Sequence, residues 1–578
     1  MLDLILRNGW VLDGLGNPKM RADIGVAEGR IQVIGDLQQA EGTRILDCSG
    51  CCISPGWVDI HGHADWTVLD YSLGLNLMIQ GCTLTVAGNC GMSPMPATGA
   101  TTRMVLEKTL RSYDERAHQA MLERFPGGSW STADWLQSIE RERPGVNYVQ
   151  LVGHSELRRC VMGHDARRAS PAEIEQMKAL LVASLEEGVW GMSSGLVYIP
   201  ACWSDTAELV ELARVVARHG GLYTSHIRGE RETNIAATQE FIEIAERAGV
   251  RAHMSHMQSK YPVYGNAMVK IELLEAARAR GVDVSCDSEA FPNCAATPAS
   301  FLQIHHLSPE EMVAQLSSLE GRARIRNMMR TMDPWHPLGR FGPGGVPFRR
   351  AWDRVVIYDC PHDRSLEGKT VAAVAVERGI SFEDALFDLA VAEGGSGPLF
   401  IHDYIEDEHY RTAPWPYCIF PSVDTGLYDP QTLTSRDLRY WRDTGYPGTV
   451  GLFPRVLGQF VREEKLLSLE EAIRKMTSFP LQRLGITDRG VVRPGMWADL
   501  TVFDPDTIAL RRAVADGNPL KRGGSRAVAD GSRAVADPQR VETFYPVGIA
   551  AVIVNGQVAL EGHTPSGVRA GQVLRRTD

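Results

Sequence analysis

The feature that most limits the possible fold is a repeating unit made of a helix, a glycine that ends it and a short strand. This unit recurs about every 30 residues. Glycines end three successive helical patterns at Gly220-Gly221, Gly249 and Gly281, and a short β-rich run follows each of them, at 222–225, 250–255 and 282–286. Parallel strands need such a crossover helix between them, so the unit predicts an α/β fold with a parallel sheet or barrel. About eight units fit into 57–484, the number in a (β/α)8 barrel.

The two ends of the chain resemble each other. Residues 4–14 and 552–562 each read as an apolar β-rich run, an Asn-Gly pair and a second apolar run. Asn-Gly accepts the positive φ of a tight hairpin turn, so both segments predict hairpins. A small β-sandwich assembled from both ends would then enclose the barrel.

These patterns divide the chain. The predicted parts are a β-sandwich of 1–56 plus 485–578, a TIM-like barrel of 57–484, and an insertion over the barrel mouth at 290–350. A degenerate Arg-Ala-Val-Ala-Asp repeat at 511–540 predicts a surface loop within the terminal β domain.

Composition excludes several classes of protein. The formal net charge of −11 is spread along the chain without a basic cluster, which argues against a nucleic-acid partner. No apolar run approaches the roughly 18 residues of a membrane helix, and the N-terminus lacks a signal-peptide pattern. The 11 scattered cysteines are typical of reduced thiols. We therefore expect a cytoplasmic protein without a membrane partner, and a homo-oligomer is one of the assembly states left open.

Candidate metal ligands lie where predicted strands end. His61 and His63 alternate along a strand and so face the same side. His226 and His256 follow two later strands, Cys90 follows 83–87, and Asp424 follows another apolar run. The carboxyl ends of barrel strands form one face, where active sites are built, so these six side chains predict a metal site.

Several motifs resemble those of a known family. The stretch from Pro55 to His63 resembles the opening metal motif of the amidohydrolase superfamily. Further segments resemble the N-acyl-D-amino-acid deacylases (D-aminoacylases) within it, at 88–91, 191–198, 225–228, 255–256, 451–458 and 471–478. The resemblance covers about 1–505 and 541–562.

The resemblance implies a (β/α)8-type barrel with a β-sandwich from both chain ends, and one or two Zn²⁺ ions. Zinc would be held by Cys90, His226 and His256, with His61 and His63 forming an adjacent, often weaker site. Cys90 would take the place of the carboxylated lysine that bridges two metals in many amidohydrolases. Asp424 would serve as metal ligand and as catalytic base.

The sequence departs from the family where a substrate would be recognised. Gln258 stands where the family usually has lysine, with Lys260 two residues further on, and Phe291-Pro292-Asn293 replaces a tyrosine-proline-tyrosine segment. A longer stretch that includes Trp441 and Arg442 replaces a short histidine-proline-arginine loop. The candidate substrate-binding residues are therefore Tyr198, Gln258, Lys260, Phe291, Trp441 and Arg442.

The sequence predicts a zinc-dependent hydrolase of a small linear amide, in which a metal-activated water attacks and Asp424 moves the proton. One alternative is a cyclic-amide hydrolase acting on a hydantoin- or lactam-like ring. It would be expected to have a carboxylated lysine, and 191–198 contains none. Another alternative is a non-catalytic barrel scaffold. The departures predict weak activity on simple N-acetyl-D-amino acids compared with bulkier or carboxylate-free amides.

Overall fold

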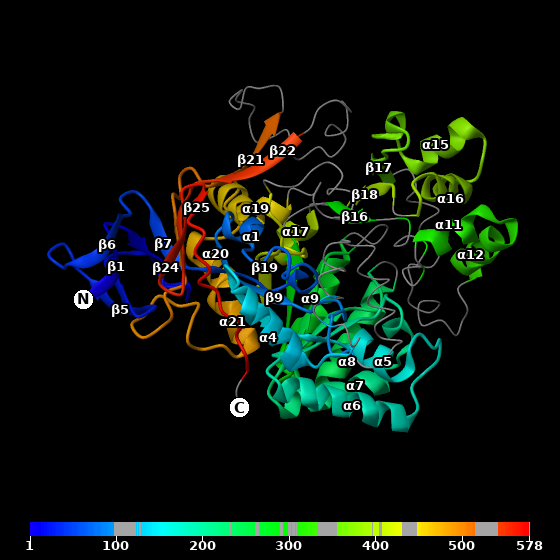
Figure 1. The fold of residues 1–578 in the computed structure, drawn as a ribbon, viewed down its shortest axis with the longest axis horizontal. Helices are drawn as coiled ribbons and strands as arrows, with labels where there is room; N and C mark the ends of the chain where they lie inside the picture. Colours follow the sequence, from blue (N-terminus) through cyan, green and yellow to red (C-terminus); the bar gives the residue numbers. More distant parts are fainter. Residues whose placement is uncertain are drawn as a thin grey trace.

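Two parallel sheets form the centre of the α/β fold (Figure 1). The computed structural model describes residues 1–97, 129–230, 233–259, 265–289, 293–296, 309–331, 355–395, 397–403, 407–430, 448–514 and 542–576, with the single residues 123, 125, 298, 302 and 307. No helix in these ranges is both long and apolar enough to cross a bilayer.

The smaller parallel sheet has the order β10-β9-β8 and the larger one the order β11-β12-β13-β14-β15-β19. Their strands are β8 (Trp57–Asp59), β9 (Cys82–Ala87), β10 (Asn147–Gln150), β11 (Val152–Gly153), β12 (Gly191–Gly195), β13 (Leu222–His226), β14 (Arg251–Met254), β15 (Val284–Glu289) and β19 (Cys418–Ser422). β11 begins directly after Leu151, which follows β10, and a parallel bridge joins Gly62 to Thr425 beyond β8 and β19. The two sheets are thus connected at both sides.

Helices follow these strands as the repeat predicts. They are α1 (Leu75–Met78), α4 (Thr132–Glu142), α5 (His154–Met162), α6 (Pro171–Glu186), α7 (Thr206–Arg218), α8 (Asn234–Ala248), α9 (Asn266–Ala279), α17 (Asp407–Thr412), α19 (Gly448–Arg455), α20 (Leu469–Met476) and α21 (Ser478–Leu484). A capping box starts α6, since the Ser170 hydroxyl accepts from the Glu173 N–H and the Glu173 carboxylate accepts from the Ser170 N–H. The predicted strands at 222–225 and 250–255 are confirmed in position by β13 and β14.

Strands from both chain ends share a seven-stranded sheet of order β25-β24-β23-β20-β7-β2-β3. These strands are β2 (Trp10–Val11), β3 (Met20–Arg21), β7 (Cys52–Pro55), β20 (Leu500–Phe503), β23 (Ile549–Val554), β24 (Gln557–Glu561) and β25 (Thr564–Pro565). A second sheet, of order β5-β4-β1-β6, contains β1 (Leu2–Arg7), β4 (Asp23–Ala27), β5 (Arg30–Gly35) and β6 (Gly42–Asp47). Side chains of both sheets, such as Leu6 and Ile553, share one buried cluster.

The two predicted Asn-Gly hairpins have different outcomes. The prediction for 552–562 is confirmed, because β23 pairs antiparallel with β24 around Asn555 and Gly556, both at positive φ. The prediction for 4–14 is wrong, because β1 and β2 belong to different sheets. Asn8 does have a positive φ of 65°, but it carries the chain from one sheet to the other.

A second group of elements has its own buried core, formed by side chains between Leu302 and Phe400. It contains an antiparallel sheet of order β16-β18-β17, made of β16 (Asn293–Ala296), β18 (Leu399–Asp403) and β17 (Val355–Asp359). Its helices are α11 (Pro309–Ser317), α12 (Leu319–Thr331), α15 (Val371–Arg378) and α16 (Phe382–Ala392). The predicted insertion at 290–350 lies partly in this group and partly outside the described residues.

The repeat segment at 511–540 begins inside a strand. β21 (Ala509–Val514) pairs antiparallel with β22 (Glu542–Val547) up to the pair Val514 and Glu542, and 515–541 lies outside the described residues. Residues 511–514 are therefore strand residues and not loop residues.

This register leads to a prediction about the repeat. Replacing 515–541 by Asn-Gly closes β21 and β22 with a two-residue turn, which suits antiparallel strands. We expect the midpoint of thermal unfolding to stay close to that of the wild type. A large fall in the midpoint would show that the repeat packs on the rest of the protein.

Candidate metal centre

Six side chains from five strand ends form two overlapping groups that could hold metal ions. One group is His61, His63, Cys90 and Asp424, and the other is Cys90, His226 and His256. Within each group the candidate ligand atoms all lie within 4.8 Å of one another. The structure thus brings together every residue that the sequence predicted as a metal ligand, with Cys90 shared by both groups.

Cys90 Sγ lies at the middle of these contacts. It is 3.3 Å from His61 Nε2, 3.6 Å from His226 Nδ1 and 3.6 Å from His256 Nε2. On the other side, Asp424 Oδ1 lies 3.0 Å from His63 Nε2 and 3.4 Å from His61 Nε2. His61 therefore contacts both Cys90 and Asp424.

Three of these residues have unusual backbone conformations. Cys90, His256 and Asp424 have positive φ angles of 53°, 31° and 51°. Non-glycine residues seldom adopt such angles, which cluster at functional sites where the surroundings enforce them. Gly88 belongs to the same loop as Cys90, and a Cβ on it would lie 2.1 Å from the carbonyl oxygen of Leu151. Only glycine fits this approach.

Asn89 fixes the loop that carries Cys90. Its side-chain amide donates to the carbonyl oxygens of Val86 and Ile60 at 3.0 and 3.2 Å, and its Oδ1 accepts from the Thr224 hydroxyl at 3.3 Å. Asn89 is buried, so these bonds are shielded from water. The loop after β9 is thereby tied to β8 and β13.

Asp424 is held through the backbone on both sides. Its N–H donates to the carbonyl oxygen of His61 at 2.7 Å, and the His63 N–H donates to Thr425 at 2.8 Å. Further along, the Thr67 hydroxyl accepts from the Leu427 N–H at 2.7 Å. The loops after β8 and β19 are thus joined, which places Asp424 against both histidines.

A buried carboxylate, Asp287, contacts His61 of the first group on the side away from Cys90. Its Oδ2 lies 3.2 Å from His61 Nδ1 and 3.0 Å from His253 Nε2. Its Oδ1 accepts from the His256 N–H and from the Ser422 hydroxyl, each at 2.9 Å. With Nδ1 directed at Asp287, the Nε2 atom of His61 points toward Cys90 and Asp424.

The charges of the site stabilise one another. Burial alone would raise the pKa of the Cys90 thiol, but His61, His226 and His256 outweigh it and hold that pKa well below its ordinary value. Burial opposes the charged form of His256, yet Cys90 and Glu230 raise its pKa to about 10. Burial would likewise raise the pKa of Asp287, but His61 and His253 keep it well below its usual range. The site therefore combines anions with cationic imidazoles, whose protons a divalent cation would displace.

The predicted substrate-binding residues are only partly described. The ring of Tyr198 meets that of His226 edge-on, with centroids 4.9 Å apart. Gln258 is buried, and its amide nitrogen donates to the Ser288 hydroxyl at 3.0 Å and the Glu289 carbonyl at 2.9 Å. Lys260, Phe291, Trp441 and Arg442 lie outside the described residues.

Sequence reasoning missed the residues that support the ligands. Asp287, Asn89 and Glu230 contact the candidate ligands or fix their loops. Two of them had a visible signal: Asp287 lies in the strand after His256, and Glu230 follows His226 by four residues. These positions alone do not show that either carboxylate contacts a histidine, because that depends on how the neighbouring strands lie side by side.

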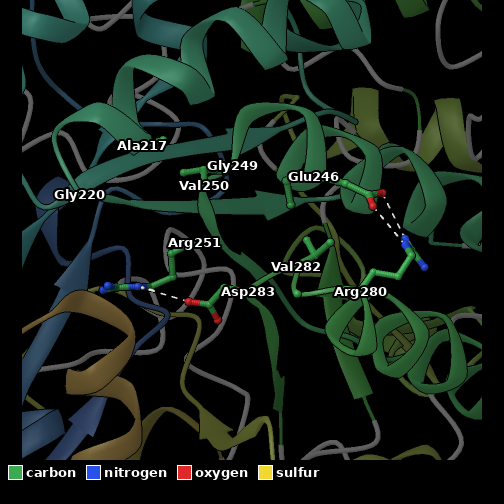
Figure 2. Close-up of a pocket in the computed structure, with 12 residues that line it drawn as sticks. Ala217, Gly220, Glu246, Gly249, Val250, Arg251, Arg280, Val282 and Asp283 are labelled. Carbon is green, nitrogen blue, oxygen red and sulfur yellow. Dashed lines mark hydrogen bonds and ion pairs between the residues drawn. The ribbon is translucent and has the colours of Figure 1, made fainter.

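A hollow of about 430 Å³ lies elsewhere, at the starts of β13, β14 and β15 (Figure 2). Its charged side chains are paired, Arg280 with Glu246 at 3.1 Å and Arg251 with Asp283 at 3.6 Å. The candidate ligands His226 and His256 lie at the opposite ends of β13 and β14, so the hollow is separate from the metal centre.

Comparison with known proteins identifies the family. Residues 397–559 match a model described as the amidohydrolase family. The whole chain is 31% identical to the N-acyl-D-glutamate deacylase of Alcaligenes xylosoxydans xylosoxydans, covering 97% of that protein. The chain belongs to the N-acyl-D-amino-acid deacylases of the amidohydrolase family. It is also 31% identical to the D-aminoacylase of the same organism, with 100% of this chain and 98% of that protein aligned.

Solved deacylase structures share this fold. The N-acyl-D-glutamate deacylase of Bordetella bronchiseptica, solved with zinc and a phosphonate inhibitor, has a TM-score of 0.72 at 30% identity, with both chains fully covered. A D-aminoacylase described as defining a subset of amidohydrolases has a TM-score of 0.71 at 28% identity, again with full coverage of both chains. The α/β fold expected from the family resemblance is confirmed at this level.

Because Cys90 belongs to both groups, its removal should have a large effect on metal binding. Thiolate is a strong zinc donor, so Cys90→Ala should lose most of the bound zinc, as measured by metal analysis of purified protein. Cys82→Ala is the matched control, because Cys82 is also buried but lies outside both groups. Full zinc occupancy in Cys90→Ala would refute the ligand assignment.

Proposed function

We propose that this deacylase family member is a zinc-dependent hydrolase of linear amides that removes the N-acyl group from a D-amino acid or a related amine. The observation that carries the proposal is the pair of overlapping groups around Cys90, which combine one thiol, four imidazoles and one carboxyl. The relatives that support it are N-acyl-D-glutamate deacylase and D-aminoacylase.

The donor set fits zinc. Thiolate and imidazole are its preferred protein ligands, and the low pKa of Cys90 supplies the thiolate. The outer nitrogens of His61 and His256 face Asp287 and Glu230, an arrangement common around metal-ligating histidines. We assign one ion to Cys90, His226 and His256 and a second to His61, His63, Cys90 and Asp424. A related D-aminoacylase is described as having a binuclear metal centre.

When bound, zinc polarises the amide carbonyl and lowers the pKa of a nearby water. Asp424 is the group of this chain that moves the proton. Burial would raise the pKa of its carboxyl, but His61 and His63 lower that pKa below its ordinary range. An ionised carboxylate is a proton acceptor. Asp424 takes the proton from the attacking water and passes it to the amide nitrogen as the C–N bond breaks, so a neutral amine leaves.

The strand connections support a closed (β/α)8 barrel, a finer statement than the α/β fold. The eight strand positions run from β8 through β9, β10 with β11, and β12 to β15, and return through β19 to the bridge between Gly62 and Thr425. We further propose that the seven- and four-stranded terminal sheets form a β-sandwich domain of 1–56 and 485–578. The 57–484 barrel, its insertion at 290–350 and a homo-oligomer stay predictions.

The alternatives have less support. A cyclic-amide hydrolase with a carboxylated lysine would need that lysine at a strand end, and β12 (Gly191–Gly195) contains none. A non-catalytic scaffold would have no need to assemble all six candidate ligand side chains around one thiol.

The geometry of Gln258 supports a difference in substrate recognition. Its amide donors are engaged with Ser288 and Glu289, and the residue is only 2% exposed. It therefore offers no cation to a substrate carboxylate, unlike the lysine usual in the family. We propose that the site depends less on such a carboxylate than the sites of its relatives.

Steady-state hydrolysis tests the function. A panel of N-acyl-D-amino acids, N-acyl-L-amino acids and amides without a carboxylate should show activity that is lost on chelation and restored by zinc. Asp424→Asn should lower kcat by about 10²- to 10⁴-fold, the usual contribution of a general base. Undiminished kcat in folded Asp424→Asn would exclude this role.

Gln258→Lys tests the substrate proposal. The wild type should have a lower kcat/KM for N-acetyl-D-amino acids than for bulkier or carboxylate-free amides, and the lysine should shift this ratio toward the amino acids by pairing with their carboxylate. Gln258→Met is the control for size without charge. If N-acetyl-D-amino acids are already the best wild-type substrates, the proposal is wrong.

A further inference from the structure

Glu230 lies between two of the candidate zinc ligands. It follows β13, and its Oε2 is 3.5 Å from His226 Nε2 while its Oε1 is 3.3 Å from His256 Nδ1. Its side chain is only 12% exposed. One carboxylate thus faces both imidazoles of the group that contains Cys90, His226 and His256.

Each of these rings turns its other nitrogen toward the thiol. His226 Nδ1 and His256 Nε2 each lie 3.6 Å from Cys90 Sγ. A neutral imidazole carries one N–H and one lone pair. In this structure both contacts to Glu230 are at ion-pair distance. With the N–H of each ring on the nitrogen that faces Glu230, both lone pairs would be directed to the Cys90 side, where a metal would bind.

The segment between His226 and Glu230 is anchored by Arg228. Its guanidinium donates to both carboxylate oxygens of Glu240 on α8, at 2.8 and 3.1 Å, and to the carbonyl oxygen of Cys202 at 3.0 Å. Arg228 is 2% exposed. Arg228 therefore pairs with Glu240 on α8, and Glu230 faces the two histidines.

The group of His61, His63, Cys90 and Asp424 is supported by a different carboxylate, that of Asp287. Asp287 contacts His61 Nδ1, and it reaches His256 through the backbone N–H and not through the ring. The two histidine rings beside Glu230 therefore depend on a different acid from the His61 ring. This separation allows the two supports to be tested one at a time.

We propose that Glu230 is a positioning residue that fixes the tautomers of His226 and His256 together and so controls how tightly the Cys90 group retains zinc. The inference rests on the proposed function, since it requires zinc at this group. Glu230 contacts the outer nitrogens of these two ligands. It acts through the two ligands.

The test compares zinc release from Glu230→Gln and wild-type holoenzyme into an excess of a chromogenic chelator. An amide cannot accept N–H bonds on both of its ends, so at least one ring loses its partner. Loss of an outer partner of this kind typically costs about 10- to 100-fold in metal affinity, and we expect a matching rise in the release rate. The visible absorption spectrum of the cobalt-substituted protein should also change, because ligand orientation alters it.

Glu208→Gln is the matched control. Glu208 is a buried carboxylate on α7 whose partners are His154 and Arg158, and neither belongs to the metal groups. Its loss should lower thermal stability without changing zinc release or the cobalt spectrum. A purely structural role for Glu230 would give the same pattern in both variants.

The outcomes separate the two proposals. Unchanged zinc release and an unchanged cobalt spectrum in Glu230→Gln overturn the inference. If that variant does not fold, Glu230→Asp takes its place, because the shorter side chain cannot reach both rings, and unchanged release again overturns the inference. A wild-type protein that binds no zinc contradicts the proposed function instead.

Discussion

The arrangement of the metal centre depends on the buried carboxylate of Asp287. This one side chain, on β15, contacts His61 after β8, His253 in β14, the backbone of His256 and the hydroxyl of Ser422 in β19. An isolated carboxylate would be costly to bury, but each oxygen here faces two polar groups. Asp287 thereby fixes the relative positions of four strand ends, and through them the two metal-binding groups.

Other buried charges of the site also face partners of opposite charge. The thiolate of Cys90 faces three imidazoles, Asp424 faces two, and Arg228 is matched by Glu240. Such networks are stable only when nearly every member has a partner, because removing one partner leaves an unpaired charge in the low-dielectric interior. The positive φ angles of Cys90, His256 and Asp424 show that the surrounding contacts also outweigh a local backbone cost.

Much of the site was predictable because its ligands follow a simple rule. Strand ends of a parallel sheet share one edge, so His61, Cys90, His226, His256 and Asp424 could be grouped from their positions alone. Their supports could not be found in this way, because Asp287 and Glu230 resemble ordinary charged residues until neighbouring strands are in register. The Asn8-Gly9 turn shows the same limit in the fold. A dipeptide fixes a positive φ, but which sheet the chain joins next depends on partners far away in sequence.

The terminal sheet has a consequence for how the chain is made. Its strand β7 lies between β2 and β20, and the Ser54 hydroxyl meets the carbonyl of Thr501 across 447 positions of sequence. During synthesis from the N-terminus, one edge of β7 therefore stays unpaired until β20 (Leu500–Phe503) has left the ribosome. Exposed strand edges favour aggregation, and such distant pairing is slow. The nascent chain must therefore keep this edge protected until β20 is available to pair with it.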